Sequence, residues 1–328
     1  MARLVPAALS GADIHMIYPP TVMHYLTACK SYIESLVARG GPLESDDAVF
    51  LELLAGLRGF LRDAEPPFSE VDFREWFGPA MSDATLQGRA VRHPRGYDDD
   101  FEIIDRIYRR DVSADKALTN WDRFYQRQTA PEAVRNRKAY FHALLDRHAE
   151  PGRPLQVLKL ANGPGRCLFE WFELHPDAPV QVDCVEGDAA AIAHSVELNR
   201  PYLDRVSFTH AEARSYRPHK AYDLIWVPGL FDSFNNGLAV AMIIRLMPSL
   251  APGGQLVIGN FSDRNPSRNY MELLGECPLY QRSDEQWREL ALACGVAPEC
   301  IRVGGSPGSG HLFLHLAAEA ERLALMPG

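Results

Sequence analysis

The chain has 328 residues, a length that favours two domains or one large domain with an extension. Hydrophobic residues make up 46% and charged residues 23%, the balance of a globular protein with a sizeable core. The net charge of −9 argues against a nucleic-acid partner, because phosphate binding needs a concentrated basic surface. No apolar run approaches the roughly 18 residues that cross a bilayer, so no membrane association is expected.

Cysteine and histidine usage indicates no metal centre. The six cysteines are scattered without a Cys-x-x-Cys pair, which predicts neither a disulfide framework nor a structural zinc site. His311 and His315 are close in sequence, but along a strand they would lie about 13 Å apart, too far to share an ion. The first 15 residues carry one basic residue and a short apolar run that Pro6 interrupts, too little for a signal peptide. We therefore expect a cytoplasmic protein with reduced thiols.

Residues 1–128 are predicted to be helical, and we interpret them as a cap or lid domain. Apolar residues recur every three or four positions over 22–37 and again over 49–61, which predicts two amphipathic helices. A third helix is expected after Ser69 and a fourth over 101–109. The loop before the fourth contains Pro and Gly, which disfavour a regular helix.

A domain boundary is predicted at residues 128 and 129. Thr129, Pro131 and Glu132 indicate a helix start, because Thr is a capping residue, Pro suits the first turn and Glu completes a capping box. The helix should run to about His148. Residues 129–328 would then form a second domain.

From residue 154 onward, short apolar runs alternate with helical segments. The first five runs imply a parallel sheet, since helical stretches between them allow right-handed crossovers. The last two are joined by only six residues, too few for a parallel crossover, and should form an antiparallel hairpin. The runs are 155–161, 180–186, 205–211, 222–228, 255–261, 300–304 and 311–317.

The first of these strands leads into a glycine loop. Gly163 and Gly165 let the backbone turn sharply and approach a ligand at the carboxyl edge of the sheet, where such folds bind ligands. A dinucleotide-binding loop would place a third glycine at position 168, where this chain has Leu168. The loop therefore argues against dinucleotide binding; together with the C-terminal hairpin and the two acidic residues described next, it favours S-adenosylmethionine over NAD.

Two acidic residues follow the next two strands. Glu186 ends the second strand, and its carboxylate can accept both hydroxyls of a ribose. Glu212 follows the third strand, where it can meet an adenine amino group or serve only as a surface acid. We also predict that Pro228, at the end of the fourth strand, binds the cofactor.

Several stretches, taken together, resemble one family of enzymes. They are NGPGR from Asn162, YDLIWVPGLFD from Tyr222, LAPGGQLVIGNF from Leu250 and NPSRNYMELL from Asn265, with HPRGYDDDFEIID and APEAVRNRKAYF upstream. They resemble bacterial S-adenosylmethionine-dependent methyltransferases related to the enzymes that make 3-hydroxypalmitic acid methyl ester. The resemblance covers residues 90–318. It implies an α/β, Rossmann-like class I methyltransferase fold behind the helical cap, with S-adenosylmethionine as cofactor and a small molecule as substrate.

The resemblance leaves two reactions open. Some related enzymes of secondary metabolism close S-adenosylmethionine to azetidine-2-carboxylate and release methylthioadenosine. In many class I methyltransferases an acidic residue two positions before the first glycine holds the cofactor's α-ammonium. Counted from Gly163, that position is Ala161, and Asn162 follows it. Loss of the carboxylate lowers the pKa of the ammonium and so favours the uncharged amine. Cyclisation needs the uncharged amine, whereas methyl transfer does not use it. Methyl transfer is the first hypothesis, cyclisation the second, and a non-catalytic cofactor-binding protein the third.

The remaining candidates lie in a lid loop and on the boundary helix. Tyr97 could place its ring against the sulfonium, and Asp100 could bind an amine or act as a base, or else cap the helix from Phe101. Besides these two, Asn162 and Phe231 are predicted catalytic residues, and Asp232 either faces the acceptor or caps the next helix. Predicted to hold the cofactor from the boundary helix are Arg135, Asn136 and Tyr140.

Overall fold

The computed structural model describes most of the chain, namely residues 20–63, 73–97, 100–149, 152–275, 278–305 and 310–318. Contacts between residues divide the chain into two compact units. The first, the helical unit, comprises Met1–Asp98, Asp111–Gln128 and Arg268–Cys277. The second, the sheet unit, comprises Asp99–Arg110, Thr129–Ser267 and Pro278–Gly328. Each unit is therefore built from segments that are far apart in the sequence.

The helical unit contains the helices predicted from apolar spacing. The predictions over 22–37 and 49–61 are confirmed by α2 (Pro20–Ala38) and α3 (Asp47–Asp63). Where the chain after Ser69 is described, it forms the 3-10 helix η2 (Glu75–Met81). The other described helices of this unit are η1 (Glu44–Asp46), α5 (Leu86–Arg92), α7 (Thr119–Arg127) and α12 (Arg268–Gly275). No helix in the described ranges of the chain is long and apolar enough to cross a membrane.

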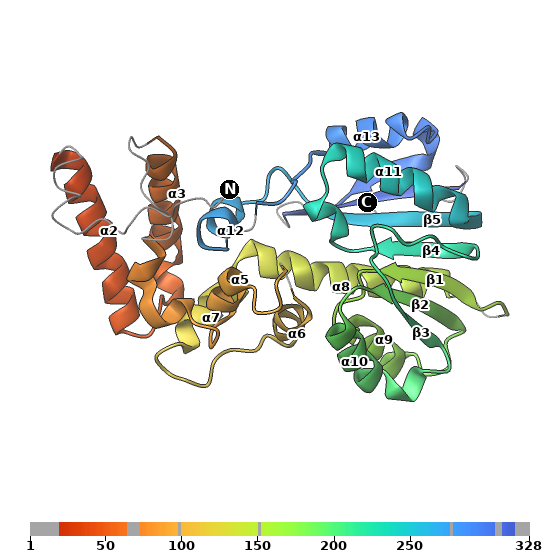
Figure 1. Ribbon diagram of the computed structural model, residues 1–328, viewed down its shortest axis with the longest axis horizontal. Helices are drawn as coiled ribbons and strands as arrows, with labels where there is room; N and C mark the ends of the chain where they lie inside the picture. Colours follow the sequence, from red (N-terminus) through yellow and green to blue (C-terminus); the bar gives the residue numbers. More distant parts are fainter. Residues whose placement is uncertain are drawn as a thin grey trace, which may run out of the picture. The chain divides into compact units, whose positions relative to one another are not determined.

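Aromatic rings form the core of the helical unit. The ring of Phe50 lies 6.0 Å from that of Trp121 and 5.0 Å from that of Phe124. Tyr270, on α12, packs its ring 5.6 Å from that of Phe124. Figure 1 shows the blue α12 in this unit beside helices coloured red to yellow. A single cut after residue 128 does not describe this arrangement, because the contacts that build the core join distant parts of the chain.

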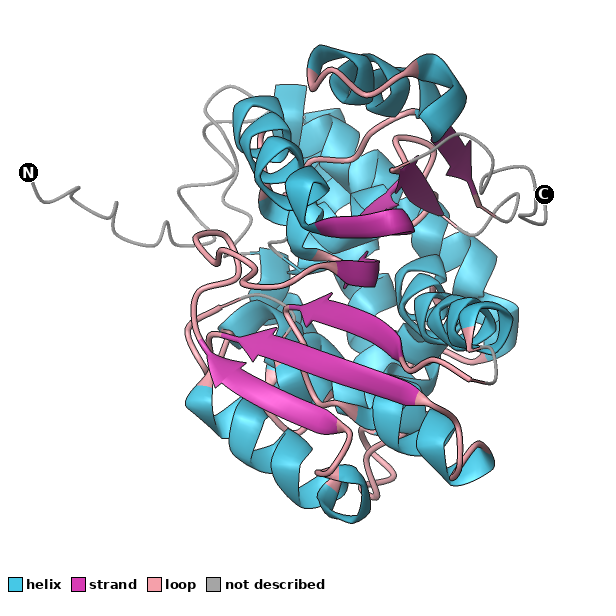
Figure 2. Cartoon of the chain, turned by 90° about the vertical axis from the view of Figure 1, so that its right-hand side faces the viewer, coloured by secondary structure: helices cyan, strands magenta, loops and turns pink. Residues whose placement is uncertain are grey.

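The sheet unit is built around a seven-stranded sheet in the order β3-β2-β1-β4-β5-β7-β6 (Figure 2). The first five strands pair in parallel, and β7 pairs antiparallel with both β5 and β6. Both the parallel sheet and the terminal hairpin are therefore confirmed. The strands are β1 (Leu155–Leu160), β2 (Val180–Glu186), β3 (Val206–His210), β4 (Tyr222–Val227), β5 (Leu250–Phe261), β6 (Ile301–Gly304) and β7 (His311–Ala317).

Helices cover both faces of the sheet. On one face, α8 (Thr129–His148) and α9 (Arg166–Leu174) bury apolar side chains against the central strands. On the other face, α11 (Asn236–Leu246) and α13 (Asp284–Ala293) do the same. α10 (Ala189–Leu198) follows β2. The helix predicted from Thr129 to about His148 is confirmed by α8. Burial on both faces explains why the central strands are almost continuously hydrophobic.

A buried ion pair holds α6 (Phe101–Arg109) to the rest of the sheet unit. The guanidinium of Arg166 donates from Nε and Nη2 to the two carboxylate oxygens of Asp105, at 2.5 and 3.0 Å. The ring of Phe101 also lies 5.2 Å from that of His194 on α10. The helix predicted over 101–109 therefore exists, but it belongs to the sheet unit and not to the N-terminal helical part.

Two buried histidines lie on β7. His315 Nε2 is hydrogen-bonded to the Tyr140 hydroxyl at 2.7 Å, and His315 Nδ1 lies 3.1 Å from Gln255 Oε1. His311 is 2% exposed and lies 5.3 Å, ring to ring, from Phe261. Burial lowers the pKa of each imidazole to about 3, helped at His311 by the positive charge of Arg137. Both side chains are therefore neutral at pH 7.

These histidines should make the sheet unit sensitive to acid. Their unfolded pKa is about 6.5, so between that pH and about 3 the unfolded state binds more protons than the folded state. The free energy of unfolding should then fall as pH drops below about 6.5, by up to about 1.4 kcal/mol per pH unit for each histidine. Urea unfolding at pH 7.5, 6.5 and 5.5 measures this slope. His315→Gln should make it shallower than in the unmodified chain, and an unchanged slope would contradict the assignment.

Candidate functional site

The loop after β1 is shaped by left-handed backbone at every second residue. Ala161, Gly163 and Gly165 have φ of 52°, 62° and 72°. Glycine adopts this conformation without steric cost, whereas it costs an alanine about 1–2 kcal/mol. The loop thus turns sharply at the carboxyl edge of the sheet, where parallel α/β folds bind ligands.

The two glycines of the loop have different surroundings. A methyl group added at Gly163 would have no atom within 4 Å, so this side of the loop is open. A methyl group added at Gly165 would overlap the hydroxyl of Ser195 and lie 2.9 Å from Asn199 Nδ2, both on the α10 side. Gly163 therefore allows a ligand to approach the backbone, and Gly165 allows the loop to pack on α10.

Substitution of each glycine by alanine should separate these two roles. Gly163→Ala should reduce affinity for S-adenosylhomocysteine by about tenfold or more, because the methyl group fills the open side, with about 1–2 kcal/mol of strain. Gly165→Ala should instead lower the free energy of unfolding by about 2 kcal/mol through overlap with Ser195. Calorimetric titration and urea unfolding of both variants test the pair. Equal effects of the two variants on both measurements would refute the distinction.

Asn162 holds the loop from within. Its Nδ2 donates to the carbonyl of Gly163 at 3.1 Å and to Ser195 Oγ at 3.0 Å. Its Oδ1 and its backbone carbonyl both accept from the ammonium of Lys159, at 2.9 and 2.5 Å. Asn162 was predicted to be catalytic, but its side chain is 3% exposed and engaged in these bonds. Its contacts make it a positioning residue for the loop.

The carboxylate of Glu186 ties the end of β2 to the glycine loop. Its Oε2 accepts from the backbone N–H of Gly163 at 2.8 Å. Its Oε1 accepts from the backbone N–H groups of Gly187 and Asp188, at 2.8 and 3.1 Å. A carboxylate offers about four acceptor positions, so these bonds leave about one for a ligand hydroxyl. Glu186 thus lies where the open side of the loop and the end of β2 meet.

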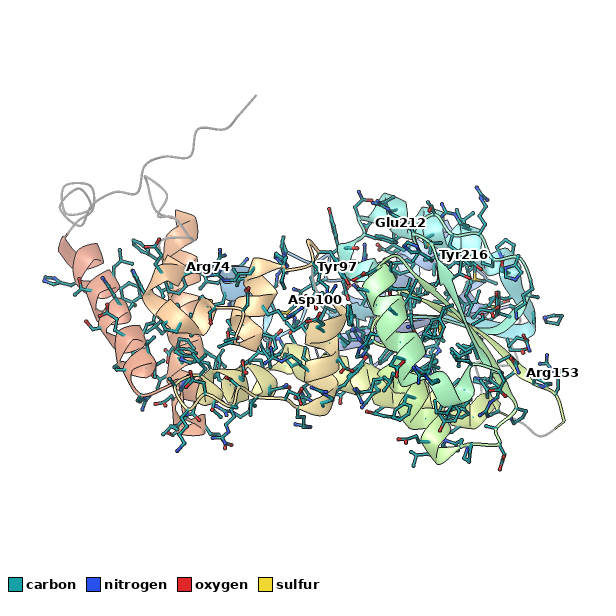
Figure 3. All side chains as sticks on the ribbon, turned by 60° about the horizontal axis from the view of Figure 1, so that its bottom comes forward. Arg74, Tyr97, Asp100, Arg153, Glu212 and Tyr216 are labelled. Carbon is teal, nitrogen blue, oxygen red and sulfur yellow. The ribbon has the colours of Figure 1, made fainter. Side chains whose placement is uncertain are left out.

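Glu212 lies beside the same edge (Figure 3). A methyl group added at Gly187 would be 3.2 Å from Glu212 Oε1, so the absence of a side chain at Gly187 lets this carboxylate approach the turn after Glu186. The Glu212 side chain is 66% exposed, and its only ion pair among the described residues is with Arg214 at 3.9 Å. Its oxygens are therefore available to a ligand that extends from Glu186 along the sheet edge.

A second polar group lies at the ends of β4 and β5. Asp232, 5% exposed, accepts through Oδ1 from Asn260 Nδ2 at 2.5 Å and from the backbone N–H of Phe261 at 2.8 Å. A methyl group added at Gly229, the residue after Pro228, would lie 2.7 Å from Arg137 Nη1 and 3.4 Å from Asp232 Oδ2. A buried cation and a buried carboxylate thus both border the turn after β4.

Two interpretations of this region need correction. Asp232 does not cap α11, because the side chain of Asn235 accepts from the Leu238 N–H in that role. Phe231 does not face an acceptor: it is fully buried, with its ring 5.3 Å from that of Phe234 and 5.8 Å from that of Trp287. Aromatic packing, which a local sequence window does not reveal, places it in the core.

Tyr140 is half-buried and packs against the core of the sheet unit. Its ring stacks on that of Phe313 at 3.9 Å, and its hydroxyl bonds to His315. On the same helix Asn136 is exposed, and burial, followed by the nearby charge of Arg110, lowers the pKa of the half-buried Arg135. Contacts to the methionyl carboxylate from these last two residues stay predictions.

Tyr97 and Asp100 fall in different units. Tyr97 is 38% exposed and belongs to the helical unit. Asp100 belongs to the sheet unit, where its Oδ1 accepts from the backbone N–H groups of Glu102 and Ile103 at 2.9 and 3.1 Å (Figure 3). The capping alternative thus accounts for Asp100, whereas Asp98 and Asp99 lie outside the described residues. A role for Tyr97 at the sulfonium stays a prediction.

One residue beneath the loop was not singled out from the sequence. The turn begins at Ala161, the first residue with left-handed backbone. Counted from this start, the position two residues earlier is Lys159, whereas the count from Gly163 gave Ala161. Lys159 is 2% exposed although it lies in a strand of otherwise largely apolar residues. A lysine within a run such as LQVLKLA is the signal that could have indicated it. In the described part of the chain, no group of three His, Cys, Asp or Glu side chains could hold a metal ion.

The strand order, with an antiparallel β7 between β5 and β6, defines the Rossmann-like fold of class I methyltransferases, as the resemblance implied. No family model and no curated protein matches the chain. Among solved structures, a possible exported protein from Bordetella parapertussis is 18% identical with a TM-score of 0.61. The match covers 91% of this chain and 98% of that one. At this identity the likeness establishes the fold alone.

Two structures with lower TM-scores are bound to S-adenosylhomocysteine. The 1,6-didemethyltoxoflavin-N1-methyltransferase of Burkholderia thailandensis is 19% identical, with 56% of this chain and 77% of that chain covered and a TM-score of 0.42. The N-methyltransferase NodS of Bradyrhizobium japonicum WM9 is 15% identical, with coverages of 55% and 87% and a TM-score of 0.39.

Proposed function

We propose that this protein is an enzyme that binds S-adenosylmethionine and transfers its methyl group to a small molecule. The observation that carries the proposal is the meeting of the open side of Gly163 with the carboxylate of Glu186 at the carboxyl edge of a class I methyltransferase fold. The open space beside Gly163 and the unused acceptor position of the Glu186 carboxylate fit a nucleoside ligand.

The residues of this edge suggest an orientation for the cofactor. Glu186 would accept from one ribose hydroxyl, and Glu212 would accept from the adenine amino group. The methionyl end would then lie over the loop at Gly163. When bound, S-adenosylmethionine supplies a methyl group on a sulfonium, which an acceptor attacks in line. The task of the chain is then to hold donor and acceptor in register, since positioning alone supplies much of the rate acceleration of such transfers.

Cyclisation of S-adenosylmethionine is the second candidate, and the buried ammonium of Lys159 favours it. In this reaction the α-ammonium first loses one proton to solvent. The amine nitrogen then attacks the γ-carbon, and the bond between that carbon and sulfur breaks with its electron pair going to sulfur. The products are methylthioadenosine and azetidine-2-carboxylate. A cation near the amino group disfavours the ammonium and so favours the nucleophile.

Mass spectrometry after incubation with S-adenosylmethionine distinguishes the two reactions. For a methyltransferase we expect no turnover without an acceptor, and S-adenosylhomocysteine once a suitable small carboxylic acid, phenol or amine is added. Methylthioadenosine together with an equimolar amount of azetidine-2-carboxylate, formed without any acceptor, would overturn methyl transfer and establish the second candidate. Absence of binding of either adenosyl compound in a calorimetric titration would overturn both.

A further inference from the structure

Lys159 is a buried cation that has no carboxylate partner within the described part of the chain. Its ammonium donates to the carbonyl and to the side-chain Oδ1 of Asn162, at 2.5 and 2.9 Å. An ammonium has three donors, so one N–H remains. Among the described residues Lys159 forms no ion pair, although it is 2% exposed. Buried charges are normally paired, because removal from water is costly. The burial of the Lys159 charge beneath the glycine loop therefore needs a functional explanation.

Among the described residues, the groups on the elements around β1 form no ion pair with Lys159. Cys184 faces it across the strand pair, and burial raises the pKa of that thiol to about 12, so it is neutral at pH 7. On α9, Arg166 is itself neutralised by Asp105. On α8, burial lowers the pKa of His142, which bonds to the Cys167 carbonyl. Glu186, the acid of the adjoining strand, is bonded to three backbone N–H groups.

The charge acts on the loop itself. The carbonyl that Lys159 binds belongs to the residue directly before Gly163, whose open side is the proposed place of the methionyl end. In a buried setting a unit charge acts more strongly than in water, since the effective dielectric constant is well below that of the solvent. A ligand ammonium over this loop would be disfavoured, and a ligand carboxylate would be favoured.

We propose that Lys159 is a specificity-determining residue that makes the methionyl end of the site select ligands whose α-amine is uncharged and whose carboxylate is ionised. This inference rests on the proposed binding of S-adenosylmethionine. It assigns the ammonium of Lys159 the role of lowering the pKa of the bound α-amino group. The chain would thus hold a free amine lone pair at neutral pH, which ring closure requires and methyl transfer does not use.

The test uses S-adenosylhomocysteine, which carries the same amino and carboxylate groups and does not react. The α-amino group of a peptide has a pKa of about 8, and the ionised carboxylate beside the amino group of S-adenosylhomocysteine raises its pKa further, so binding of the neutral amine must release a proton over the whole range tested. Affinity should therefore rise with pH between the bound and the free pKa, by up to about tenfold per pH unit. Calorimetric titration at pH 6.5, 7.5 and 8.5, each in two buffers of different ionisation enthalpy, measures affinity and released protons together.

Variants assign the effect to Lys159. Lys159→Gln and Lys159→Met should abolish the proton release and flatten the pH dependence. Lys220→Gln is the matched control, because Lys220 bonds to Gln156 near the start of β1 and to Asp183 in the middle of β2, and it should keep the slope of the unmodified chain. Persistence of the slope in both Lys159 variants would overturn the proposal.

Measurements on the unmodified chain decide the question even if the variants fail to fold. Affinity that does not change from pH 6.5 to 8.5, with no proton released, would overturn the role of Lys159 while leaving cofactor binding intact. The desamino analogue of S-adenosylhomocysteine, which keeps the carboxylate, should bind without proton release. Release with that analogue would mean that Lys159 itself gives up the proton, and would also overturn the proposal. Failure of S-adenosylhomocysteine to bind at any of these pH values would instead refute the proposed function.

Discussion

Replacement of Glu186 by glutamine should reduce affinity for S-adenosylhomocysteine by about 100-fold or more, with the sheet unit still folded. The carboxylate accepts from three backbone N–H groups, of Gly163, Gly187 and Asp188. A glutamine keeps one oxygen but turns the other into an NH₂ group, which then faces an N–H donor. The loop loses its tie to β2, and the ligand loses a charged acceptor. Hydrogen bonds to charged groups contribute about 1.5–3 kcal/mol each, which sets the expected loss.

Calorimetric titration of Glu186→Gln against the unmodified chain measures this effect, with circular dichroism as the check on folding. Glu197→Gln is the matched control, because Glu197 lies on an exposed face of α10 and pairs only with Arg200 among the described residues. It should bind like the unmodified chain. Glu212→Gln should lie between the two, since its side chain is largely exposed. If Glu186→Gln binds S-adenosylhomocysteine as the unmodified chain does, the ribose does not lie at this carboxylate.

The parts of the fold that the sequence predicts are those that depend on local pattern. The strands β1 to β5 are runs of apolar residues, and burial on both faces makes such runs visible without knowledge of their partners. The hairpin of β6 and β7 follows from a connection too short for anything else. Glu186 was found in the same way, since the end of an apolar run fixes the edge of the sheet.

The parts that the sequence does not predict depend on contacts between distant residues. The pairing of Asp105 with Arg166 assigns α6 to the sheet unit, and the ring of Tyr270 assigns α12 to the helical unit. Phe231 and Tyr140 were interpreted as site residues because they follow or face the right elements, yet aromatic packing buries the ring of Phe231 and stacks that of Tyr140 on Phe313. No window of neighbouring residues contains this information.

Lys159 illustrates a different kind of omission. The prediction that an acid is missing near the loop was counted from Gly163, because glycine is the residue expected to adopt left-handed backbone. The turn begins at Ala161, with φ of 52°, and the count therefore shifts by two residues. What lies at the shifted position is a cation and not a neutral residue. The backbone conformation of one alanine thus changes the expected charge at the methionyl end.

Replacement of Asp105 by alanine should lower the free energy of unfolding of the sheet unit by about 3–5 kcal/mol, because it removes both carboxylate acceptors from the largely buried guanidinium of Arg166. The two side chains are 8% and 14% exposed, and both carboxylate oxygens accept from the guanidinium. Asp105 also forms an ion pair with Arg109 at 3.8 Å, which the substitution removes as well.

Removal of the other partner should cost less. Arg166 begins α9, where a cation is disfavoured by the helix dipole, and a carboxylate left near that end is favoured. Arg166→Met should therefore destabilise the sheet unit by less than Asp105→Ala does.

The double variant should be more stable than the sum of the two single effects predicts, because it removes both charges of the pair. Urea unfolding of the three variants gives this cycle. Arg200→Ala, which breaks an exposed pair with Glu197, should change stability by less than about 1 kcal/mol. Additive single effects would mean that the two charges do not stabilise each other, and that α6 is held to the sheet unit by apolar packing alone.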